Sequence, residues 1–523
     1  MWVVLLLVYS ILLFCDQLHD TIAIWYLSCA LFAGLSGYFL SLRMRLQVHI
    51  QDCMDVHSPF VDDAWRIYSC RVTLHGLSML FFFLMGVWYG YCGNLYTPLE
   101  IGRLDLTFER CNAISVWFFW CAYFFLYCGA NSRGLEKCSF GWTFYPPLSS
   151  RSLGRSTFYL VASLHLLTMS SLLSSINFIV GASFTSMSGL LEAPIFTTAI
   201  AYGSWLVLTS LPVTAAGLLM VLADKVAFTH YFDCRDFTFM SDPILFVHLF
   251  WFFAHPEVYI LVLPIMGYLS RTFSCIMMRP VFHKSAALTA IQLIGIMGYF
   301  VYGHHLFTMG TSIDTRGFFS VMTGLVAIPT SAKVMTWIGG LYGSYVPGHP
   351  IMVWLFSFAF HFSLGGMTGL ILSVATLDLQ LHDTYFVVGH FHLILAVAIV
   401  CVCPALYVEF CGYYFGMRCS LWPHHYLAAV LSLGTVILFV VYHSVGLLGV
   451  PRRMITMADV IVWVPGMVWA EMGFGMVSLV VFCVLYMIVC DGMFCTMGYG
   501  VDGMVSWSAW AWGFVSMSVK LRW

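Results

Sequence analysis

Long apolar stretches separated by short polar connections run along the whole chain. A membrane-spanning helix needs about 20 mostly apolar residues. Twelve segments meet this requirement, and we expect spans near 21–42, 70–95, 111–130, 156–183, 193–224, 243–270, 285–306, 317–341, 351–377, 385–408, 425–448 and 461–490. An even number of crossings predicts that the two ends of this bundle lie on the same side of the membrane. A further helix over Met1–Cys15 would break this parity.

The pattern predicts an all-α fold, a polytopic membrane bundle of about twelve transmembrane helices, with no internal repeat and no soluble domain. We expect an apolar N-terminal extension over 1–19, one helical bundle over 20–490 and a C-terminal tail over 491–523. Lysine and arginine occur in connections of both parities, so the positive-inside rule gives only a weak orientation.

The composition narrows the class of protein. The chain is 61% hydrophobic and 9% charged, whereas a soluble domain carries about 25% charged residues. A net charge of −2 gives no signature of polyanion binding, so nucleic acid is not an expected partner. The 18 cysteines lie scattered, mostly in apolar runs, and no pair of CxxC motifs occurs. We therefore expect them to pack as small hydrophobic residues and not as disulfides or metal ligands.

Six histidines inside apolar segments carry the chemistry. Intramembrane ionisable residues are costly and usually functional, and imidazole is the commonest metal ligand. In the sequence Trp-Phe-Phe-Ala-His-Pro-Glu-Val-Tyr, His255 and Tyr259 lie four apart, on one face of a helix. Glu257, two positions from each, must point largely away from them.

A three-histidine metal site is the first centre that the spacing predicts. Adjacent residues differ by about 100° around a helix, so His304 and His305 can converge on one ion only near a helix end. Together with His255 they would supply three nitrogen ligands. Such a set, with one open position, suits copper or zinc.

His390 and His392 must serve two further centres. About 200° of helical rotation separates them, so a regular helix cannot present both to one ion. His75 is a lone histidine in the middle of another apolar segment. Paired with one of the other two, it would give bis-imidazole ligation of a low-spin haem. The remaining histidine would leave a five-coordinate haem with an open face for a gas.

At this point the chain resembles the haem–copper oxidases, and within them the family of mitochondrial-type cytochrome c oxidase subunit 1. The resemblance runs from about Asp20 to Asp459. It rests on ordered motifs: HPEVY at 255–259, HH at 304–305, IPTSAK at 328–333, HDTYFVVGHFH at 382–392 and PRR at 451–453.

The resemblance implies a role for each of these histidines. His255, His304 and His305 match the ligands of copper B, and His390 matches the proximal ligand of haem a3. His75 and His392 match the axial pair of haem a. Tyr259 matches the tyrosine that the family cross-links to the copper ligand at 255, where it can give an electron and a proton to oxygen.

Other matched residues surround the haems. His382 and Asp383 match a magnesium site that a partner subunit completes. The residues that match groups near the haems or their propionates are Arg45, Trp142, Arg452 and Arg453. Guanidinium groups suit carboxylates. Ile455 and Thr456 stand where the family usually has serine and aspartate, which puts its peripheral sodium or calcium site in doubt.

Two proton routes are also implied. Glu257 faces away from the copper ligands and is placed to relay protons. The residues that match the D pathway leading to it are Asp105 at the mouth, Asn94, Asn112, Ser170, Ser171 and Asn177. Lys333 is a lone lysine in an apolar span, which is costly. It matches the K pathway with Ser270 and Thr330, leading towards Tyr259.

The resemblance therefore implies an enzyme, the catalytic subunit of a terminal respiratory oxidase with its oxidase bundle over 20–490. It would oxidise cytochrome c, reduce O2 to water and pump protons across the mitochondrial inner membrane, or, as the alternative, a bacterial plasma membrane. Implied partners are membrane lipid, a copper A-bearing subunit 2 that receives electrons from cytochrome c, subunit 3 and accessory subunits. No cysteine–histidine cluster suited to copper A occurs in this chain.

Three other interpretations compete. A quinol oxidase subunit 1 shares nearly all the motifs, but its usual extra helices are not evident. A nitric oxide reductase is disfavoured by the presence of Glu257, Tyr259 and Lys333. A metal-free proton-coupled transporter with histidine relays leaves the spacing of His390 and His392 unexplained.

Overall fold

The computed structural model of the chain describes residues 18–52, 61–131, 138–151, 155–185, 193–232, 241–415, 419, 421–455 and 464–496. Within this part the regular structure is helical, and one isolated bridge joins Thr384 to Pro451. The predicted extension over 1–19 and the tail over 491–523 fall largely outside the described residues, as does Thr456. Those boundaries stay predictions.

The helices follow one another in a simple order. The first half of the described chain contains α2 (Leu18–Asp52), α3 (Val61–Leu77), the π-helical stretches η1 (Ser78–Leu84) and η2 (Gly86–Gly93), α4 (Asn94–Ile101), α5 (Glu109–Asn131), α6 (Leu148–Arg151), α7 (Ser156–Thr185) and α8 (Ile195–Val226). The second half contains α9 (Pro243–Ile276), α10 (Lys284–Gly298), the 3-10 turn η4 (Tyr302–Leu306), α11 (Ile313–Leu325), α12 (Ala327–Leu341), α13 (Pro350–Leu372), α14 (Ala375–Leu381), α15 (Tyr385–Phe415), α16 (Leu421–Leu447) and α17 (Val464–Thr496).

Twelve helical segments of the described chain are long and apolar enough to cross a membrane, which confirms the predicted all-α bundle. Helices suit this environment because lipid offers no partner to backbone polar groups. Two boundaries differ from expectation. The second span runs further, over Ala64–Ile101, because the chain stays helical through η1 and η2 until Gly102 turns it at a φ of 71°. The span expected over 351–377 ends at Leu372, and α14 forms separately.

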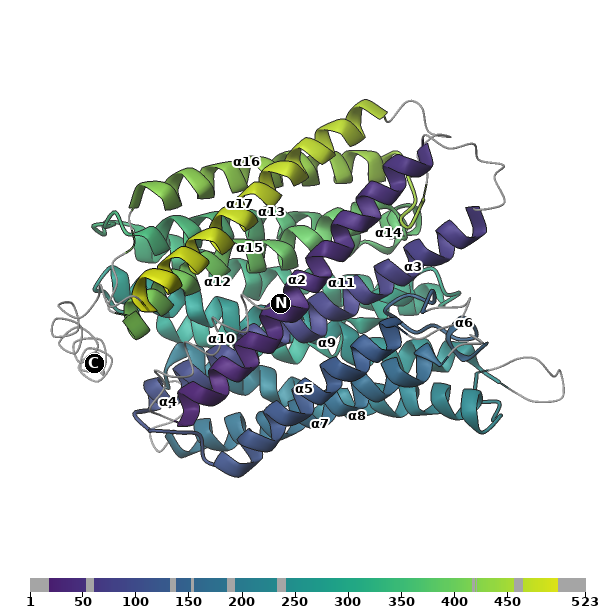
Figure 1. Cartoon of the computed structure of the whole chain (residues 1–523), viewed down its shortest axis with the longest axis horizontal. Helices are drawn as coiled ribbons and strands as arrows, with labels where there is room; N and C mark the ends of the chain where they lie inside the picture. The colour runs from purple at the N-terminus through teal and green to yellow at the C-terminus, as the bar shows by residue number, and fades with distance from the viewer. Residues whose placement is uncertain are drawn as a thin grey trace.

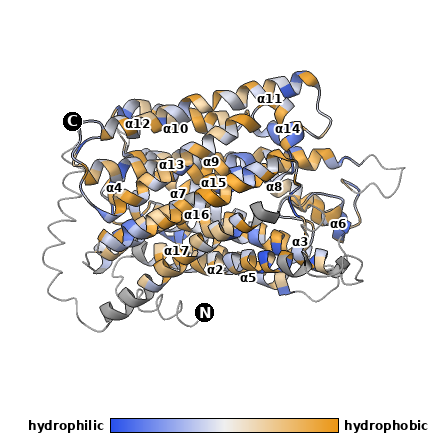
Figure 2. Cartoon of the chain, turned by 90° about the horizontal axis from the view of Figure 1, so that it is seen from above, coloured by the Kyte–Doolittle hydropathy of each residue, from blue (hydrophilic) through white to orange (hydrophobic). Residues whose placement is uncertain are grey.

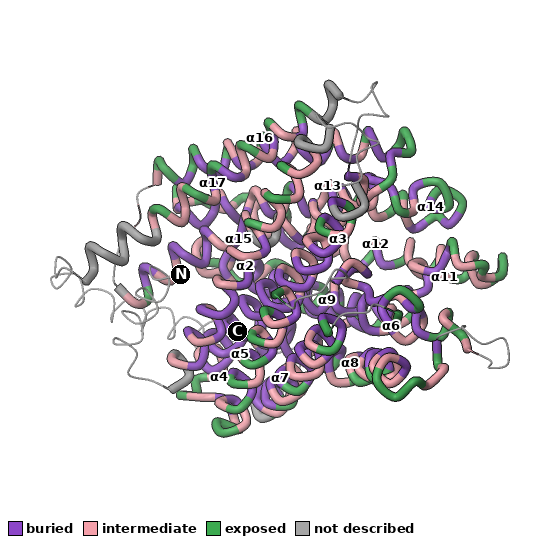
Figure 3. Tube along the Cα trace, turned by 45° about the vertical axis from the view of Figure 1, so that its right-hand side comes forward, coloured by how far each residue is buried: buried purple, intermediate pink, exposed green. Residues whose placement is uncertain are grey.

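Helices that follow one another along the chain mostly lie side by side (Figure 1), as in the pairs α7–α8, α8–α9 and α16–α17. Apolar residues cover the helix lengths, and hydrophilic ones gather towards the two ends of the bundle (Figure 2). Burial is uneven (Figure 3): α9 runs through the interior with 72% of its apolar window buried, while the span Val468–Met487 of α17 has 17%. The most buried part of the bundle therefore lies around α9.

Small residues allow the closest helix contacts. A Cβ added to Gly434 on α16 would lie 2.8 Å from the carbonyl oxygen of Gly473 on α17. Close backbone approach at small residues is how membrane helices gain packing without a hydrophobic driving force.

Candidate functional site: a histidine-lined cavity

One large cavity inside the bundle collects the histidines that the sequence singled out. Its volume is about 800 Å³, at the upper end of the range for small-molecule sites. His382 lines it, and so do the six histidines that the sequence singled out: His75, His255, His304, His305, His390 and His392. They come from α3, α9, η4 and α15, so the fold brings together segments more than 300 positions apart.

The first group is a cluster of three histidines, of which His255 is buried and the other two are half-buried. His255 Nδ1 and His304 Nε2 each lie 3.2 Å from His305 Nε2, and one nitrogen from each ring lies within 4.8 Å of the others. Ligands about 2.0–2.1 Å from an ion in tetrahedral geometry are separated by roughly 3.3 Å. The spacing of the cluster therefore fits one metal ion.

Local structure orients these three imidazole rings. The 3-10 turn η4 places His304 and His305 at a helix end, as their adjacency requires. His305 stacks on Trp251 with ring centroids 3.7 Å apart, and His304 Nδ1 lies 3.1 Å from the hydroxyl of Thr323. The Tyr259 ring lies one helical turn beyond His255, with centroids 4.7 Å apart.

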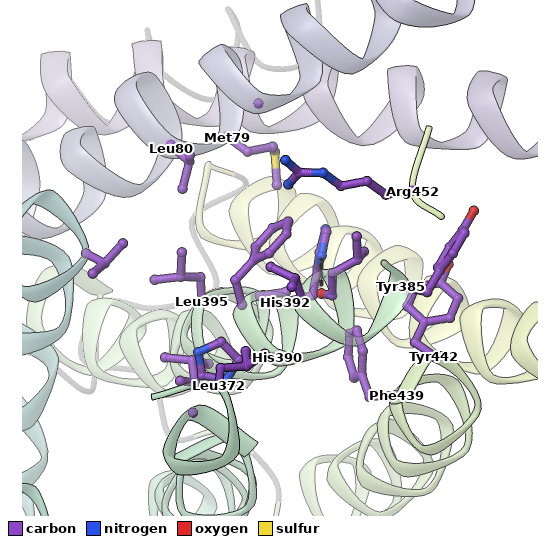
Figure 4. Close-up of a pocket in the computed structure, with 18 of the residues that line it drawn as sticks. Met79, Leu80, Leu372, Tyr385, His390, His392, Leu395, Phe439, Tyr442 and Arg452 are labelled. Atoms are coloured by element: carbon purple, nitrogen blue, oxygen red, sulfur yellow. Dashed lines mark hydrogen bonds between the residues drawn. The ribbon is translucent and has the colours of Figure 1, made fainter. Parts of the chain in front are cut away.

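His390 and His392 project from opposite sides of α15 (Figure 4), in agreement with their spacing. His390 Nδ1 lies 3.0 Å from the Gly365 carbonyl oxygen, and His392 Nδ1 lies 2.9 Å from the carbonyl oxygen of Val388. A carbonyl oxygen can only accept, so in both rings Nδ1 carries the proton. The other nitrogen, Nε2, is left with a lone pair for a metal.

His75 faces His392 across the cavity. Its Nδ1 donates to the Gly37 carbonyl oxygen at 2.8 Å, so its Nε2 also keeps a lone pair. The His75 and His392 rings are nearly parallel, at 14°, with centroids 6.5 Å apart. That separation leaves room for an ion with a bond of about 2.0–2.1 Å to each ring, as in bis-imidazole ligation.

A polar rim closes one end of the cavity. Residues 383–385 pair with the segment Val450–Arg452, and the Arg452 guanidinium forms an ion pair with Asp383. His382 Nε2 lies 3.8 Å from the Asp383 carboxylate. Burial and the neighbouring Arg452 lower the pKa of Arg453. Two adjacent guanidinium groups with one carboxylate between them favour a further anionic partner.

Arg45 and Trp142 also line this cavity. The Arg45 guanidinium donates to the Glu471 carboxylate and to the Tyr442 hydroxyl, each at 2.7 Å. It also lies over the Phe474 ring, 3.8 Å from its centroid. One ion pair, one hydrogen bond and packing on an aromatic ring therefore hold this side chain in place.

Glu257 lies on the other side of α9 from the three-histidine cluster. It lines a second cavity of about 30 Å³ together with Ser171, Thr168 and Trp142, which is room enough for a water molecule. Its two carboxylate oxygens are buried and make no hydrogen bond within the described chain. Trp142 lines both cavities, so it separates the carboxyl from the histidine-lined space.

The other polar residues that match the D pathway do not line this second cavity and form local hydrogen bonds. The Asn112 amide donates to Asn94 Oδ1 at 2.6 Å, Asn177 accepts from the Phe108 N–H at 2.9 Å, and Asp105 accepts from the Leu106 N–H at 2.7 Å. Ser170 lies 3.3 Å from the Tyr26 hydroxyl.

Sequence reasoning missed Tyr26. Its hydroxyl also donates to Ser115 at 2.7 Å and lies 3.3 Å from Ser174. A tyrosine in an apolar span looks like a packing residue, and only the fold shows that it links serines of two other helices.

Lys333 lies fully buried on α12. Its ammonium group donates to the Ser270 hydroxyl at 2.8 Å, and Trp337 donates to the same oxygen at 2.9 Å. Thr330, one turn earlier, lines the large cavity, as does Tyr259. The fold thus joins Lys333 to Ser270 and places Thr330 between them and the histidines.

A half-buried ionic cluster beside Ser270 was not predicted from the sequence. The Arg271 guanidinium lies 3.1 Å from Glu409 and 3.4 Å from Glu100. The hydroxyls of Tyr96 and Tyr268 each donate to Glu409 at 2.8 Å. Each charge stands at the end of its own apolar span, so the linear pattern suggested loop residues and gave no sign that three helices bring them together.

We expect Arg271→Met to destabilise the protein by about 1–3 kcal/mol, because it leaves two half-buried carboxylates without the cation between them. The midpoint of thermal unfolding of the purified protein measures this. Arg279→Met, at an exposed arginine that donates to Ser344, is the matched control and should change the midpoint little. Equal midpoints for the two variants would refute a structural role for the cluster.

Comparisons with known proteins agree with this architecture. The family model described as Cytochrome C and Quinol oxidase polypeptide I matches residues 21–476. A protein named cytochrome c oxidase subunit 1 from Pecten maximus is 39% identical over 448 residues, which are 83% of this chain and 90% of that protein. Its namesake from Eremothecium gossypii is 37% identical over 443 residues, with coverages of 83% and 80%.

A solved structure shares the fold. It is described as a heme-copper terminal oxidase dimer, with a TM-score of 0.73 at 18% identity, and the match covers 95% of this chain and 92% of that one. The family match spans nearly all the described helices, and two relatives exceed 35% identity over most of their length. The chain belongs to the cytochrome c and quinol oxidase polypeptide I family.

Proposed function

We propose that this chain is the catalytic subunit of a cytochrome c oxidase, which reduces O2 to water and moves protons across the mitochondrial inner membrane. The observation that carries the proposal is the single cavity lined by a cluster of three histidines, one separate histidine and a facing pair. The relatives at 37–39% identity bear the same name and come from eukaryotes.

The donor set fits two haems and a copper. His255, His304 and His305 would hold copper B, His390 would hold haem a3, and the axial pair of haem a would be His75 and His392. The proton positions support this, because Nδ1 of each haem-side ring is bound to a carbonyl and Nε2 remains for iron. These groups would supply the electron transfer and the gas-binding site.

Tyr259 would support the oxygen chemistry. Its ring packs edge-on against His255 at the wall of the cavity, so the phenol can give an electron and a proton to a group bound there. His255 Nε2 is buried without a hydrogen-bond partner in the described chain, which leaves it available for the covalent link between histidine and tyrosine that the family forms.

Glu257 would carry protons from the D pathway. Asp105 would open the route, Asn94 and Asn112 would continue it, and Ser170, Ser171 and Asn177 would line it. A carboxyl that lacks a fixed partner can turn between water on one side and Trp142 on the other. Proton release would then occur at the polar rim.

Lys333, with Ser270 and Thr330, would form the K pathway towards Tyr259. We expect Lys333→Met to slow oxygen reduction by about 100-fold, since a residue that transfers a proton in a slow step contributes 10²–10⁴-fold. Oxygen uptake by the purified complex measures this. Lys284→Met, at the start of α10, is the control. Turnover that matches the control would exclude Lys333 from the route.

The polar rim would bind the haem propionates and a magnesium ion. Arg452 and Arg453 would hold haem propionates beside Trp142, and Arg45 would lie against haem a. His382 and Asp383 would bind magnesium together with a partner subunit. Electrons would arrive from cytochrome c through the copper A of subunit 2, and subunit 3 and accessory subunits would complete the complex.

An optical spectrum tests the proposal. The reduced-minus-oxidised spectrum of the purified complex should show two A-type haems, and metal analysis should find copper. Absence of the haems and copper would favour a transporter and refute the oxidase. Oxygen uptake with cytochrome c and not with quinol is expected. The reverse preference would establish the quinol oxidase alternative.

A further inference from the structure

Two buried cysteines lie in contact outside the residues that the proposed function uses. Cys70 on α3 and Cys138, in the connection after α5, are 68 positions apart along the chain, yet their sulfurs are 2.9 Å apart. Their exposed fractions are 6% and 0%. Non-bonded heavy atoms settle at about 3.5–4.0 Å, so these sulfurs are closer than hydrophobic packing alone would hold them.

This contact is one of three between α3 and the segment 138–142. The Gly141 N–H donates to the Thr73 hydroxyl at 3.0 Å. A Cβ added to Gly76 would lie 3.1 Å from the Trp142 side chain. The three contacts thus follow the same order along the segment (Cys138, Gly141, Trp142) as along α3. The cysteine contact is the first of them.

We propose that Cys70 and Cys138 form a disulfide that fastens the segment 138–142 to the helix carrying His75. A disulfide bond is about 2.05 Å long, so the sulfurs need to approach by less than about 1 Å. The two thiols lose two protons and two electrons as the S–S bond forms. A thiol–disulfide oxidant accepts them, and its own disulfide is reduced to two thiols.

The two sulfurs are buried, so this exchange occurs during assembly, before the segment packs. The bond closes a long loop, which restricts the unfolded chain more than a short loop would. It also fixes the neighbours of the segment: Trp142 separates the two cavities, and a Cβ at Gly141 would lie 3.1 Å from the Arg453 guanidinium. The pair therefore departs from the expectation that the cysteines serve only as small hydrophobic residues.

Differential thiol labelling of the complex tests the bond. The complex, isolated from its native membrane in N-ethylmaleimide and without reductant, is denatured in the same reagent, then reduced and treated with iodoacetamide. Cys70 and Cys138 should carry the second label, and an unreduced digest should contain their peptides joined. Cys29, a buried cysteine on α2, should carry the first label. The first label on either member of the pair, or a link to any other thiol, overturns the proposal.

A variant tests whether the disulfide holds the segment 138–142 against α3. In Cys70→Ser, Cys138 should take the first label, and the Gly141 amide should exchange its hydrogen at least about ten times faster, because local opening no longer has to break a covalent link. Cys29→Ser is the matched control. Unchanged exchange at Gly141 would show that the bond does not hold the segment. Neither readout requires oxidase activity, so failure of the proposed function would leave this test valid.

Discussion

Replacement of His255 by asparagine is expected to abolish oxygen reduction and to remove one copper ion from each complex. Asparagine keeps a polar side chain in this position but offers no imidazole nitrogen to the copper ion that we propose His255 binds together with His304 and His305. Loss of a group that merely supports a metal ligand costs 10–100-fold, so loss of the ligand itself should reduce turnover by more than about 100-fold. Oxygen uptake and copper content per haem measure the two effects.

The control for this variant is His165→Asn. His165 lies on α7, is partly buried and binds the Val161 carbonyl oxygen at 2.9 Å, but it does not line the large cavity. This control should keep full copper and full turnover. The His255 variant should retain both haems, since the rings proposed as haem ligands are untouched. Normal copper content in His255→Asn would disprove the three-histidine copper site.

Much of this site could be predicted from the sequence because helical geometry is local. The rotation between His390 and His392 follows from two positions along the chain, and the structure places the rings on opposite sides of α15. The same holds for His255, Glu257 and Tyr259 on α9. The apolar runs likewise predicted the number of spans, since the thickness of a membrane sets the length of a helix.

Contacts between distant segments could not be predicted in this way. Arg271 meets Glu409 from a helix 138 positions later, and Tyr26 meets Ser115 across 89 positions. Each residue alone is an ordinary member of its span, and no local spacing records the pairing. The Cys70–Cys138 contact is of the same kind.

The packing of Trp142 against two cavities emerges only from the fold. In the sequence, the resemblance marked it as a residue near the haems or their propionates and gave no sign of this packing. In the structure it packs against α3 at Gly76. It also forms part of the wall of the large cavity and of the small one. Its side chain therefore borders both the small cavity at Glu257 and the large cavity that the polar rim lines.

Glu257→Gln is expected to stop proton pumping and to slow oxygen reduction by about 10²–10⁴-fold, the range for loss of a proton-transfer group. Glutamine has nearly the same shape and can fill the same place beside Ser171 and Trp142, but its amide cannot take up and release a proton at this site. Acidification outside proteoliposomes, counted per electron delivered to oxygen, separates pumping from turnover.

The matched control is Glu109→Gln, at an exposed carboxyl on the first turn of α5, which should leave both rates unchanged. Glu257→Asp supplies a second comparison. A shorter carboxyl keeps the protonation chemistry but reaches less far into the small cavity, so partial turnover with some pumping is expected. Pumping at the normal ratio in Glu257→Gln would mean that protons reach the polar rim without this carboxyl, and the relay would then have to run along the wall of the large cavity.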